Sequence, residues 1–379
     1  MTFELTPEQL AVQELAKQFA ESVVAPIAEK VDKEGFFPAD TFKQLAEQGL
    51  ISVDVPVEYG GSGLDLMSES LTTVELAKKC GSTAIIHAVL GTVNHMLMDF
   101  GTEEQKAKYL PMVAQGKIGA FALTEPGAGS DAAAGTTKAV LDGDEYVING
   151  TKCFITNVGP DCGDFVIVLC NTDPEKGVRG KSAIIVDRGT PGFNIGKTES
   201  KFGCKGSNTS ELVFEDCRVP KANLIGKEGE GFKVFMKALD GGRISIAALA
   251  LGLGKAALEE SVKYAKQRVA FGKPISEQPV IQDYIAEMAT RLEVSECIMY
   301  KAIDLSERKL PYSKEATMAK YYAGESAVYA ADRAIQIFGG YGYMKDYPVE
   351  RIYRDARICT IGEGTSEIQK MVIAKTILK

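Results

Sequence analysis

A single carboxylate between two glycines is the feature of this sequence that most suggests chemistry. Glu363 lies between Gly362 and Gly364, and these glycines permit unusual backbone angles while removing side-chain bulk. Ser366, with Gln369 three residues later, predicts a capping box for a final helix, so Glu363 is expected on the preceding turn. A carboxylate on such a turn could act as a general base. The alternative is a solvated glutamate on an ordinary turn.

A second stretch could hold a ligand through its backbone. Residues 121–131 leave a β-like segment and enter a loop of small and polar residues that includes Gly127, Gly129 and Ser130. Such a loop offers several N–H groups to an anion or a flat heterocycle without obstruction by side chains. A Gly-rich loop is equally typical of a plain connection, so both interpretations stay open at this point.

Composition argues against several other kinds of site. The 379 residues are 45% hydrophobic, which is typical of a soluble globular protein, and the net charge of −8 is unsuited to a nucleic-acid partner. The eight cysteines include no CxxC pair, and only two histidines could complete a metal site, so neither metal nor disulfides are expected. His87 and His95 lie in an apolar helical stretch and are predicted to pack inside it.

The N-terminus resembles no secretory leader, because it lacks a basic segment followed by an apolar one. No apolar run approaches the roughly 18 residues that a membrane helix needs. We therefore expect a cytoplasmic protein without membrane insertion.

The first 116 residues are predicted to form an all-helical domain. Thr6 and Gln9 form a capping-box pattern with Pro7 at the first helical position, and Thr102 and Gln105 repeat that pattern. Further helices are predicted over 38–48, 67–80 and 83–100. The stretch 53–63, with three glycines, reads as a loop inside this domain.

Residues 117–226 are predicted to form a small antiparallel β domain, either a sandwich or a barrel. Asp142-Gly143 and Asn149-Gly150 have the composition of type I′ hairpin turns. Short β-rich segments are separated by turn residues, and they cover 118–124, 136–141, 145–148, 151–156, 164–170, 182–187 and 211–214.

Helical periodicity returns over residues 227–379, with long segments at 232–268, 278–307 and 313–338 and a last helix after Ser366. This pattern predicts a four-helix-bundle-like domain. A G-x-G-x-x-A pattern begins at Gly252, but no strand precedes it, so close helix packing explains it better than a dinucleotide site. The fold class is thus α+β, in the order helices, β domain, helices.

Five stretches together resemble the acyl-CoA dehydrogenase family. They span most of the chain and occur in the helix, β, helix order given above. They are Thr124-Glu125-Pro126-Gly127-Ala128-Gly129-Ser130-Asp131, Phe271-Gly272-Lys273, Gln336-Ile337-Phe338-Gly339-Gly340-Tyr341-Gly342, Tyr347-Pro348-Val349-Glu350-Arg351 and Glu363-Gly364-Thr365-Ser366.

The resemblance implies a flavoenzyme that holds FAD and oxidises the Cα–Cβ bond of an acyl-CoA thioester. It also implies a homotetramer, arranged as a dimer of dimers, that exchanges electrons with electron-transferring flavoprotein. Glu363 matches the catalytic base. Asp240, Arg243, Gly364 and Ser130 match contacts to the substrate, although a salt bridge on the helix surface would explain Asp240 equally well.

The resemblance also assigns residues to FAD. Arg268 and Phe271 match positions that reach the FAD of a neighbouring subunit, and an arginine is a suitable partner for a pyrophosphate. The predicted FAD contacts are Phe121, Leu123, Thr124, Gly129, Ser130, Phe154, Ile155, Thr156, Arg268, Phe271, Gln336, Phe338, Gly339, Gly340, Thr365 and Glu367. A helix cap would account for Gln336 as well as an FAD contact does.

Three departures from the family pattern bear on substrate choice. Gly362 stands where many relatives have a tyrosine, which should widen the space beside the thioester. Gly242 stands where a few branched-chain members carry their base, so Glu363 is the only candidate. Pro279 replaces a usual glutamine and puts one FAD contact in doubt, although Gln278 and Gln282 are near.

The resulting hypothesis is α,β-dehydrogenation of a short-chain acyl-CoA such as butyryl-CoA, or the reverse enoyl-CoA reduction. The alternative within the family is a branched-chain or aryl enoyl-CoA reductase or dehydrogenase. A third hypothesis, a catalytically silent binding subunit, conflicts with the presence of Glu363.

Overall fold

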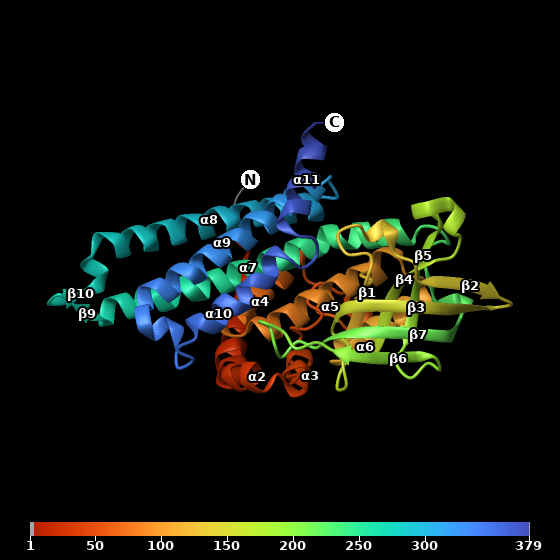
Figure 1. The fold of residues 1–379 in the computed structure, drawn as a ribbon, viewed down its shortest axis with the longest axis horizontal. Coiled ribbons are helices and arrows are strands. Elements are labelled where there is room, and N and C mark those ends of the chain that lie inside the picture. The colour runs from red at the N-terminus through yellow and green to blue at the C-terminus, as the bar shows by residue number, and fades with distance from the viewer. Residues whose placement is uncertain (1–3, 379) are drawn as a thin grey trace.

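The computed structural model describes residues 4–378 (Figure 1). In the order of the sequence, a helical region comes first, a β-sheet second and another helical region third. This order confirms the predicted α+β class. The helices before the sheet are α1 (Pro7–Phe19), α2 (Ala28–Glu34), α3 (Ala39–Glu47), α4 (Leu66–Lys79), α5 (Gly81–Phe100) and α6 (Glu103–Ala114).

Helix ends in the first region follow the local capping chemistry. The capping boxes of Thr6 with Gln9 and of Thr102 with Gln105 are both present. Asp65 accepts a hydrogen bond from the backbone N–H of Ser68 at 2.8 Å, which starts α4 one residue earlier than predicted. Cys80 alone separates α4 from α5, because its extended backbone interrupts the helix.

One mixed sheet is formed by the middle part of the sequence and lies at one end of the molecule (Figure 1). Its strands pair in the order β6-β7-β3-β2-β4-β5-β8, mostly antiparallel, and β1 joins β4 in parallel. The strands are β1 (Gly119–Ala122), β2 (Lys138–Asp142), β3 (Glu145–Thr156), β4 (Phe165–Asn171), β5 (Lys181–Asp187), β6 (Phe193–Thr198), β7 (Thr209–Pro220) and β8 (Leu224–Ile225).

The two predicted hairpin turns had different outcomes. Gly143 has a φ of 63° between β2 and β3, which confirms the turn at Asp142-Gly143. The turn at Asn149-Gly150 is wrong, because β3 continues through both residues with only a register shift against β7. The Asn149 side chain forms hydrogen bonds with Asp216 of β7 at that shift. Asn149 and Gly150 therefore belong to a β-bulge and not to a turn.

The C-terminal region is a helical bundle built on its longest helix. α7 (Gly231–Gln267) has 37 residues and is therefore about 55 Å long, and it packs against α4, α5, α8 and α9. A short β9–β10 hairpin (Val269–Ala270 and Lys273–Pro274) follows it. The other helices are α8 (Pro279–Glu307), α9 (Ser313–Phe338), α10 (Val349–Ala356) and α11 (Ser366–Ile377).

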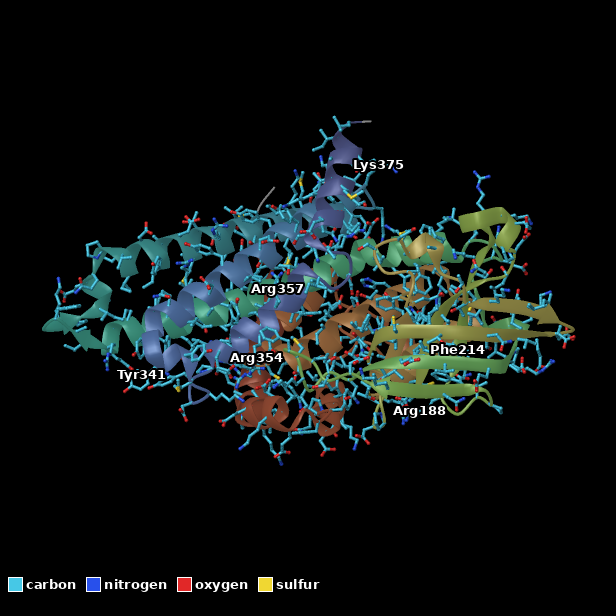
Figure 2. All side chains as sticks on the ribbon, viewed as in Figure 1. Arg188, Phe214, Tyr341, Arg354, Arg357 and Lys375 are labelled. Carbon is cyan, nitrogen blue, oxygen red and sulfur yellow. The ribbon has the colours of Figure 1, made fainter. Side chains whose placement is uncertain are left out.

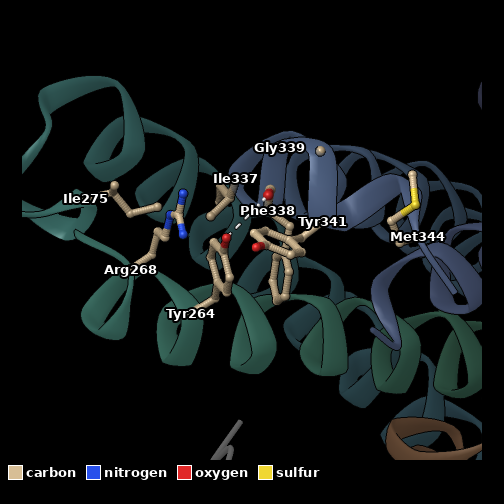
Figure 3. A pocket seen from close by; sticks show the side chains of 9 residues that line it. Tyr264, Arg268, Ile275, Ile337, Phe338, Gly339, Tyr341 and Met344 are labelled. Carbon is tan, nitrogen blue, oxygen red and sulfur yellow. Dashed lines mark hydrogen bonds between the residues drawn. The ribbon is translucent and has the colours of Figure 1, made fainter. Parts of the chain in front are cut away.

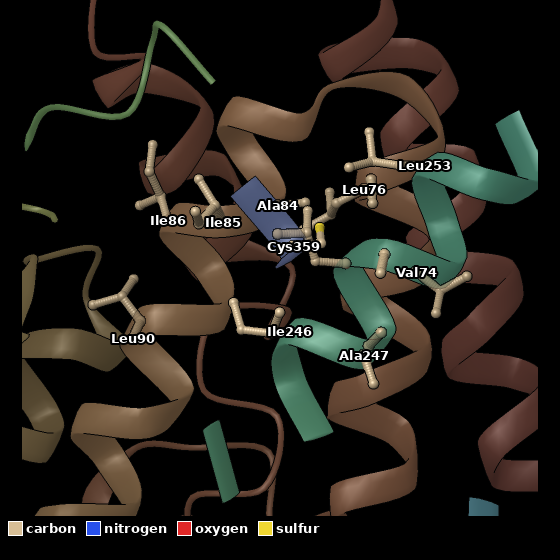
Figure 4. Packing of buried hydrophobic residues seen from close by; sticks show 14 of the residues in the cluster. Val74, Leu76, Ala84, Ile85, Ile86, Leu90, Ile246, Ala247, Leu253 and Cys359 are labelled. Carbon is tan, nitrogen blue, oxygen red and sulfur yellow. The ribbon is translucent and has the colours of Figure 1, made fainter. Parts of the chain in front are cut away.

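The two helical regions share one hydrophobic core, while most of the sheet has a second. Val74, Leu76 and Ile246 belong to the shared core, where α4 and α5 lie against α7 (Figure 4). A Cβ atom at Gly252 would collide with the carbonyl of Val74. Close packing thus explains the glycine of the dinucleotide-like pattern, as expected from the sequence.

Charged residues of α10 connect the C-terminal helices to both the N-terminal helices and the sheet region. Arg354, on α10 (Figure 2), donates to both carboxylate oxygens of Asp32 at 2.6 and 2.7 Å, and it also bonds to Glu350. The next residue, Asp355, is buried and accepts the backbone N–H of Cys204 at 2.5 Å. These contacts fix the last helices against both the N-terminal helices and the sheet region.

Among residues 4–378, no helix is both long and apolar enough to cross a membrane.

Candidate active site

Glu363 lies on the turn that precedes α11, as the sequence predicts. Its φ is 52°, a left-handed conformation that is uncommon outside glycine, and such strain often occurs at functional sites. The predicted capping box is wrong in its details, because the N-cap is Thr365, whose hydroxyl accepts from Ile368 N. Ser366 instead donates to Glu325 at 2.5 Å.

Side chains from two helices hold this turn in place. The amide nitrogen of Gln369 donates to the carbonyls of Glu363 and Gly364 at 3.1 and 3.0 Å. Lys320, on α9, is fully buried and donates to the Gly364 carbonyl at 2.6 Å. Hydrogen bonds to the carbonyls of Glu363 and Gly364 therefore hold the strained backbone of this turn in place.

The Glu363 carboxylate is buried without a partner. Neither of its oxygens accepts a hydrogen bond from any group among residues 4–378. A Cβ atom at Gly242 on α7 would collide with Oε2 of Glu363 and would lie 3.0 Å from the Thr92 hydroxyl oxygen. Glycine at residue 242 is thus what leaves space for the carboxylate between α7 and α5.

This environment raises the proton affinity of the carboxylate. Burial raises the pKa of Glu363 to about 7, although the charges of Lys320 and Arg243 oppose the shift. Burial likewise lowers the pKa of Lys320 to about 8. A carboxylate with a pKa near neutral can both take up and release a proton under ordinary conditions, as a general base must.

Asp240 and Arg243 pair with each other one turn apart on α7. Arg243 Nη1 donates to Asp240 Oδ1 at 2.7 Å and to the Thr317 hydroxyl at 3.2 Å. Ser313 also donates to Asp240 at 2.7 Å. The ion pair that the sequence offered as an alternative for Asp240 is therefore present, and its arginine is close enough to Glu363 to affect the pKa of that residue.

The loop after β1 is anchored by a buried ion pair. Lys152 Nζ lies 2.8 Å from Glu125 Oε1 and donates to the Leu123 carbonyl at 3.1 Å. Glu125 also accepts the backbone N–H groups of Thr136 and Thr137. Burial opposes ionisation, yet Lys152 and the hydrogen bonds hold the pKa of Glu125 at about 2. Glu125 therefore stabilises the fold above its ordinary pKa, and this contribution is lost as pH falls toward 2.

That anchored loop presents open backbone near one end of α7. Cβ atoms at Gly127 and Gly129 would meet nothing within 4 Å. Phe121 packs edge-on against Phe235 of α7, with ring centroids 6.2 Å apart. The backbone at Gly127 and Gly129 is thus open to a ligand, and the assignment of Thr124, Gly129 and Ser130 to FAD stays a prediction.

The end of β3 supplies an exposed aromatic ring beside this loop. Phe154 has a φ of 58° and is 65% exposed, which is unusual for a large apolar side chain. A register shift between Lys152 and Ile155 turns its ring outward. Ile155 is buried in the sheet core, so this residue can meet a ligand only through its backbone, whereas Thr156 is partly exposed.

A cleft of about 510 Å³ lies at the opposite end of α7 (Figure 3). Tyr264 stacks on Phe338 with ring centroids 4.0 Å apart, and the Arg268 guanidinium lies 5.6 Å from the centre of the Tyr341 ring. The cleft is lined by Tyr264, Arg268, Ile275, Ile337, Phe338, Gly339, Gly340, Tyr341 and Met344. The structure therefore brings four of the predicted FAD residues together here.

The remaining predicted residues are spread over the surface. Gln336 is exposed and is not part of the cleft lining. Phe271 is 96% exposed at the tip of the β9–β10 hairpin, with a φ of 52°. Glu367 is exposed on the first turn of α11, next to the capping residue Thr365. The exposure of these three side chains leaves each of them accessible to a ligand.

Sequence reasoning missed Lys320 and the Glu125–Lys152 pair as supports of the site. One signal for Lys320 was available, because it lies on the same helical stripe as the buried Ala316, Ala323 and Ala327. A lysine on a stripe of small apolar residues needs a buried partner, since an unpaired buried charge is costly.

Family models match nearly the whole chain. Models described as the N-terminal, middle and C-terminal domains of acyl-CoA dehydrogenase match residues 6–117, 120–217 and 229–378 respectively.

Individual proteins give the same result. The acryloyl-CoA reductase (NADH) of Anaerotignum propionicum is 50% identical over 382 residues, covering 100% of this chain and 96% of that protein. The structure of butyryl-CoA dehydrogenase from Megasphaera elsdenii has a TM-score of 0.97 at 42% identity, covering 100% of both chains. A chain in a structure described as the electron transferring flavoprotein of Acidaminococcus fermentans has a TM-score of 0.98 at 45% identity, again covering 100% of both.

Glu125→Gln should loosen the loop that Glu125 anchors. The substitution leaves the Lys152 charge buried without its partner, which typically costs about 3–5 kcal/mol. We expect that loss in urea unfolding, together with faster hydrogen exchange at the amides of Thr136 and Thr137. Glu145→Gln, which touches only a surface pair with Arg218, is the matched control. Equal stability of the two variants would contradict the anchoring role.

Proposed function

Because the chain belongs to the acyl-CoA dehydrogenase family, we propose that it interconverts a short-chain acyl-CoA and its 2,3-enoyl-CoA. Oxidoreduction at the CH–CH group of an acyl-CoA comes with the family. The proposal for this chain rests above all on Glu363, a buried carboxylate without a partner whose pKa is raised to about 7. The sequence offers no other base at this place, since residue 242 is glycine.

The family binds FAD, and the residues of this chain fit it. Phe154 offers an exposed ring at a strained backbone position, and the glycines of loop 123–131 leave its N–H groups unobstructed. We assign Phe121, Leu123, Thr124, Gly129, Ser130 and residues 154–156 to the flavin side, with Thr365 and Glu367 beside them. When bound, FAD supplies the acceptor, or in reverse the donor, of the hydride at the substrate β carbon.

The chain's own residues handle the proton. In the oxidative direction Glu363 takes the proton from the substrate α carbon, and its buried surroundings favour the neutral acid that results. Charge then develops on the thioester carbonyl, which needs hydrogen-bond donors. The backbone N–H of Glu363 is one such donor by resemblance, with Gly364 beside the thioester. In the reductive direction the same carboxyl returns the proton to the α carbon.

Asp240, Arg243 and Ser130 are proposed to contact the substrate. Arg243 is 8% exposed, and its Nε has no partner within the described part of the chain. Its guanidinium already bonds to Asp240 and Thr317, which sets its orientation. We infer that this pair borders the acyl-CoA and also moderates the pKa of Glu363.

The residues that we propose for FAD lie in two groups, near opposite ends of α7 in one chain. Arg268 lies 25 residues beyond Arg243 along α7, which corresponds to about 37 Å. We therefore propose that Arg268, Phe271, Gln336, Phe338, Gly339 and Gly340 bind the FAD of a neighbouring subunit in a homotetramer. The 96% exposure of Phe271 supports this, because such an apolar ring gains by being covered.

The relatives guide the choice of substrate and electron partner. A butyryl-CoA dehydrogenase and an acryloyl-CoA reductase, both acting on short acyl groups by name, align over the full chain. Another full-length match comes from a structure of an electron transferring flavoprotein. We propose butyryl-CoA-like substrates and electron exchange with an electron-transferring flavoprotein.

A branched-chain or aryl substrate is the second candidate, and Gly362 favours it. A Cβ atom at this residue would only make ordinary contact, 3.5 Å from Ile358, and its φ is not in the positive region. Glycine is therefore not required by the backbone. It leaves open space next to the base, where a bulkier acyl group could fit.

Glu363→Gln should retain FAD and bind butyryl-CoA but fail to bleach the flavin. Glutamine keeps the shape of the side chain and cannot accept the proton, and a general base typically contributes about 10²–10⁴-fold. Anaerobic stopped-flow absorbance measures the rate. Glu315→Gln, a buried glutamate that pairs with Lys314 of α9 and Lys301 of α8, is the control. Bleaching within about tenfold of the unmodified enzyme would refute Glu363 as the base.

The rate should depend on pH through Glu363. We expect kcat/KM for dehydrogenation to rise with pH through about 7, because the free enzyme needs the ionised carboxylate. Lys320→Met removes a charge that lowers this pKa, so the rise should move to higher pH. Lys314→Met, on the same helix near its exposed start, should leave the profile in place. A profile that does not move in Lys320→Met would contradict the coupling.

Gly362→Tyr should narrow the substrate range without abolishing activity. The added ring fills the open space beside the base, so turnover of branched or aryl acyl-CoAs should fall while butyryl-CoA is still oxidised. Gly362→Ala serves as the control, since its small side chain meets only ordinary contacts. An equal loss on every substrate in both variants would instead point to a requirement for glycine in the turn.

A further inference from the structure

Three polar side chains from separate segments meet at the inner side of α5. Asp54 comes from the loop before α4, Glu69 from α4 and His95 from α5, and one side-chain nitrogen or oxygen of each lies within 4.8 Å of the others. Asp54 Oδ2 and His95 Nε2 are hydrogen-bonded. We refer to these three residues as the polar cluster.

The polar cluster has more hydrogen-bonding capacity than it uses. Glu69 is 3% exposed, and neither of its carboxyl oxygens has a hydrogen-bond partner in the region from residue 4 to residue 378. Asp54 Oδ1 is likewise buried and without a partner there. Unsatisfied polar atoms of this kind are rare in native folds because each one costs free energy. A group from outside the chain would relieve that cost.

The polar cluster lies about one helical turn from the base. A Cβ atom at Gly242 would touch Glu363 and Thr92, whereas one at the adjacent Gly241 would lie 3.2 Å from His95 Nδ1. Thr92 and His95 are three residues apart on α5, a rise of about 4.5 Å. Glu363 therefore lies against Gly242 of α7, and the polar cluster, through His95, lies against the adjacent Gly241.

A glycine of α5 makes room for the carboxyl group of Glu69. A Cβ atom at Gly91 on α5 would overlap Oε1 of Glu69. The His95 side chain keeps 18% of its surface accessible, while Glu69 is almost fully enclosed. The histidine is thus the member of the polar cluster that a bound molecule could reach first.

The members of the polar cluster shift the pKa values of His95 and Glu69. Burial alone would lower the pKa of His95, but Asp54 and Glu69 raise it above its ordinary value. Burial and repulsion by Asp54 raise the pKa of Glu69. These shifts favour the charged form of His95 and the neutral form of Glu69. The polar cluster therefore offers both donors and acceptors of hydrogen bonds to a ligand.

We propose that the polar cluster is a recognition site for a neutral oxygen, such as a hydroxyl, on the far end of the acyl group. This inference rests on the proposed function, because it takes Glu363 as the group that meets the α carbon. About four carbon–carbon bonds of about 1.5 Å each, in zigzag, span one helical turn. An oxygen four bonds beyond the α carbon would therefore reach His95 and Glu69.

The chemistry favours this ligand over the two nearest alternatives. A methyl group at the same place would leave the buried polar atoms unpaired, and sites built for a hydroxyl reject such analogues. A carboxylate would meet the charge of Asp54 next to the imidazolium, so its own charge would not be balanced. A neutral donor and acceptor satisfies His95 and Glu69 together.

Binding of a matched pair of thioesters tests the proposal. The pair is ω-hydroxypentanoyl-CoA and hexanoyl-CoA, which have equal chain length and differ by a hydroxyl in place of a methyl group. The FAD-loaded Glu363→Gln protein is titrated by calorimetry, so that binding is measured without turnover. We expect the hydroxylated compound to bind about tenfold to hundredfold more tightly, as one charge-assisted hydrogen bond implies.

Variants of Glu69, made in the Glu363→Gln protein, test whether Glu69 causes the preference for the hydroxylated thioester. Glu69→Leu should abolish the preference for the hydroxyl, whereas Glu69→Gln should keep most of it, because a neutral amide retains a donor and an acceptor. Glu75→Gln is the matched control, since Glu75 is buried on the same helix but pairs with Lys78. It should leave the preference unchanged.

Each other outcome overturns the proposal. Equal binding of the two thioesters, or a preference that survives Glu69→Leu, shows that the polar cluster does not meet the acyl group. A stoichiometric divalent metal that is lost in Glu69→Leu assigns the polar cluster to a cation instead. If the unmodified enzyme bleaches with butyryl-CoA in any of these cases, the proposed function stands. A protein that no acyl-CoA binds or bleaches would instead overturn the proposed function.

Discussion

A carboxylate that is buried without any hydrogen-bond donor is the constraint on which the rest of this structure depends. Without charges nearby, such a carboxyl group would stay protonated, and its burial without a hydrogen bond would cost free energy. Lys320 and Arg243 limit that cost by acting through space, without bonding to the oxygens of Glu363. These charges keep the pKa of Glu363 near neutral, where the group can both gain and lose a proton. A direct ion pair would lower that pKa further.

Holding Glu363 in this state requires rigid surroundings. Its backbone is in the left-handed region, and Gln369 and Lys320 fix the carbonyls of the turn. The lysine comes from α9, the glutamine from α11, and the space for the carboxylate from a glycine of α7. The bundle therefore has a functional role beyond its stability, because three of its helices must keep their spacing for one side chain to stay both buried and unpaired.

The sequence predicted most of the fold but only part of the site. Helix order, the capping boxes at Thr6 and Thr102 and the turn at Gly143 are local patterns, and the structure has them. The hairpin at Asn149-Gly150 failed because the same residue types also suit a bulge, where Asp216 in another strand decides the outcome. Glu363 stood out because its glycine neighbours mark a special backbone.

The polar cluster shows where sequence reasoning stopped. Asp54, Glu69 and His95 are far apart in the sequence, each on a segment whose local pattern is ordinary, and His95 was predicted simply to pack inside its helix. His87 fits that prediction, since it is buried and bonds to the Leu50 carbonyl and to Thr73. The two histidines differ in their partners, because His95 meets the acids Asp54 and Glu69 whereas His87 meets only neutral groups.

One structural device appears twice at this end of the bundle. Gly242 on α7 makes room for the carboxyl of Glu363, and Gly91 on α5 makes room for that of Glu69. In both cases a buried acid faces a helix backbone that offers it no donor, since helical N–H groups are already bonded within the helix. A fold selected for stability alone would fill such a space with an apolar side chain, because a well-packed apolar group there is at least as stabilising as an unsatisfied acid. The two buried acids, each set against a helical glycine, are therefore better explained by a requirement of function than by one of stability.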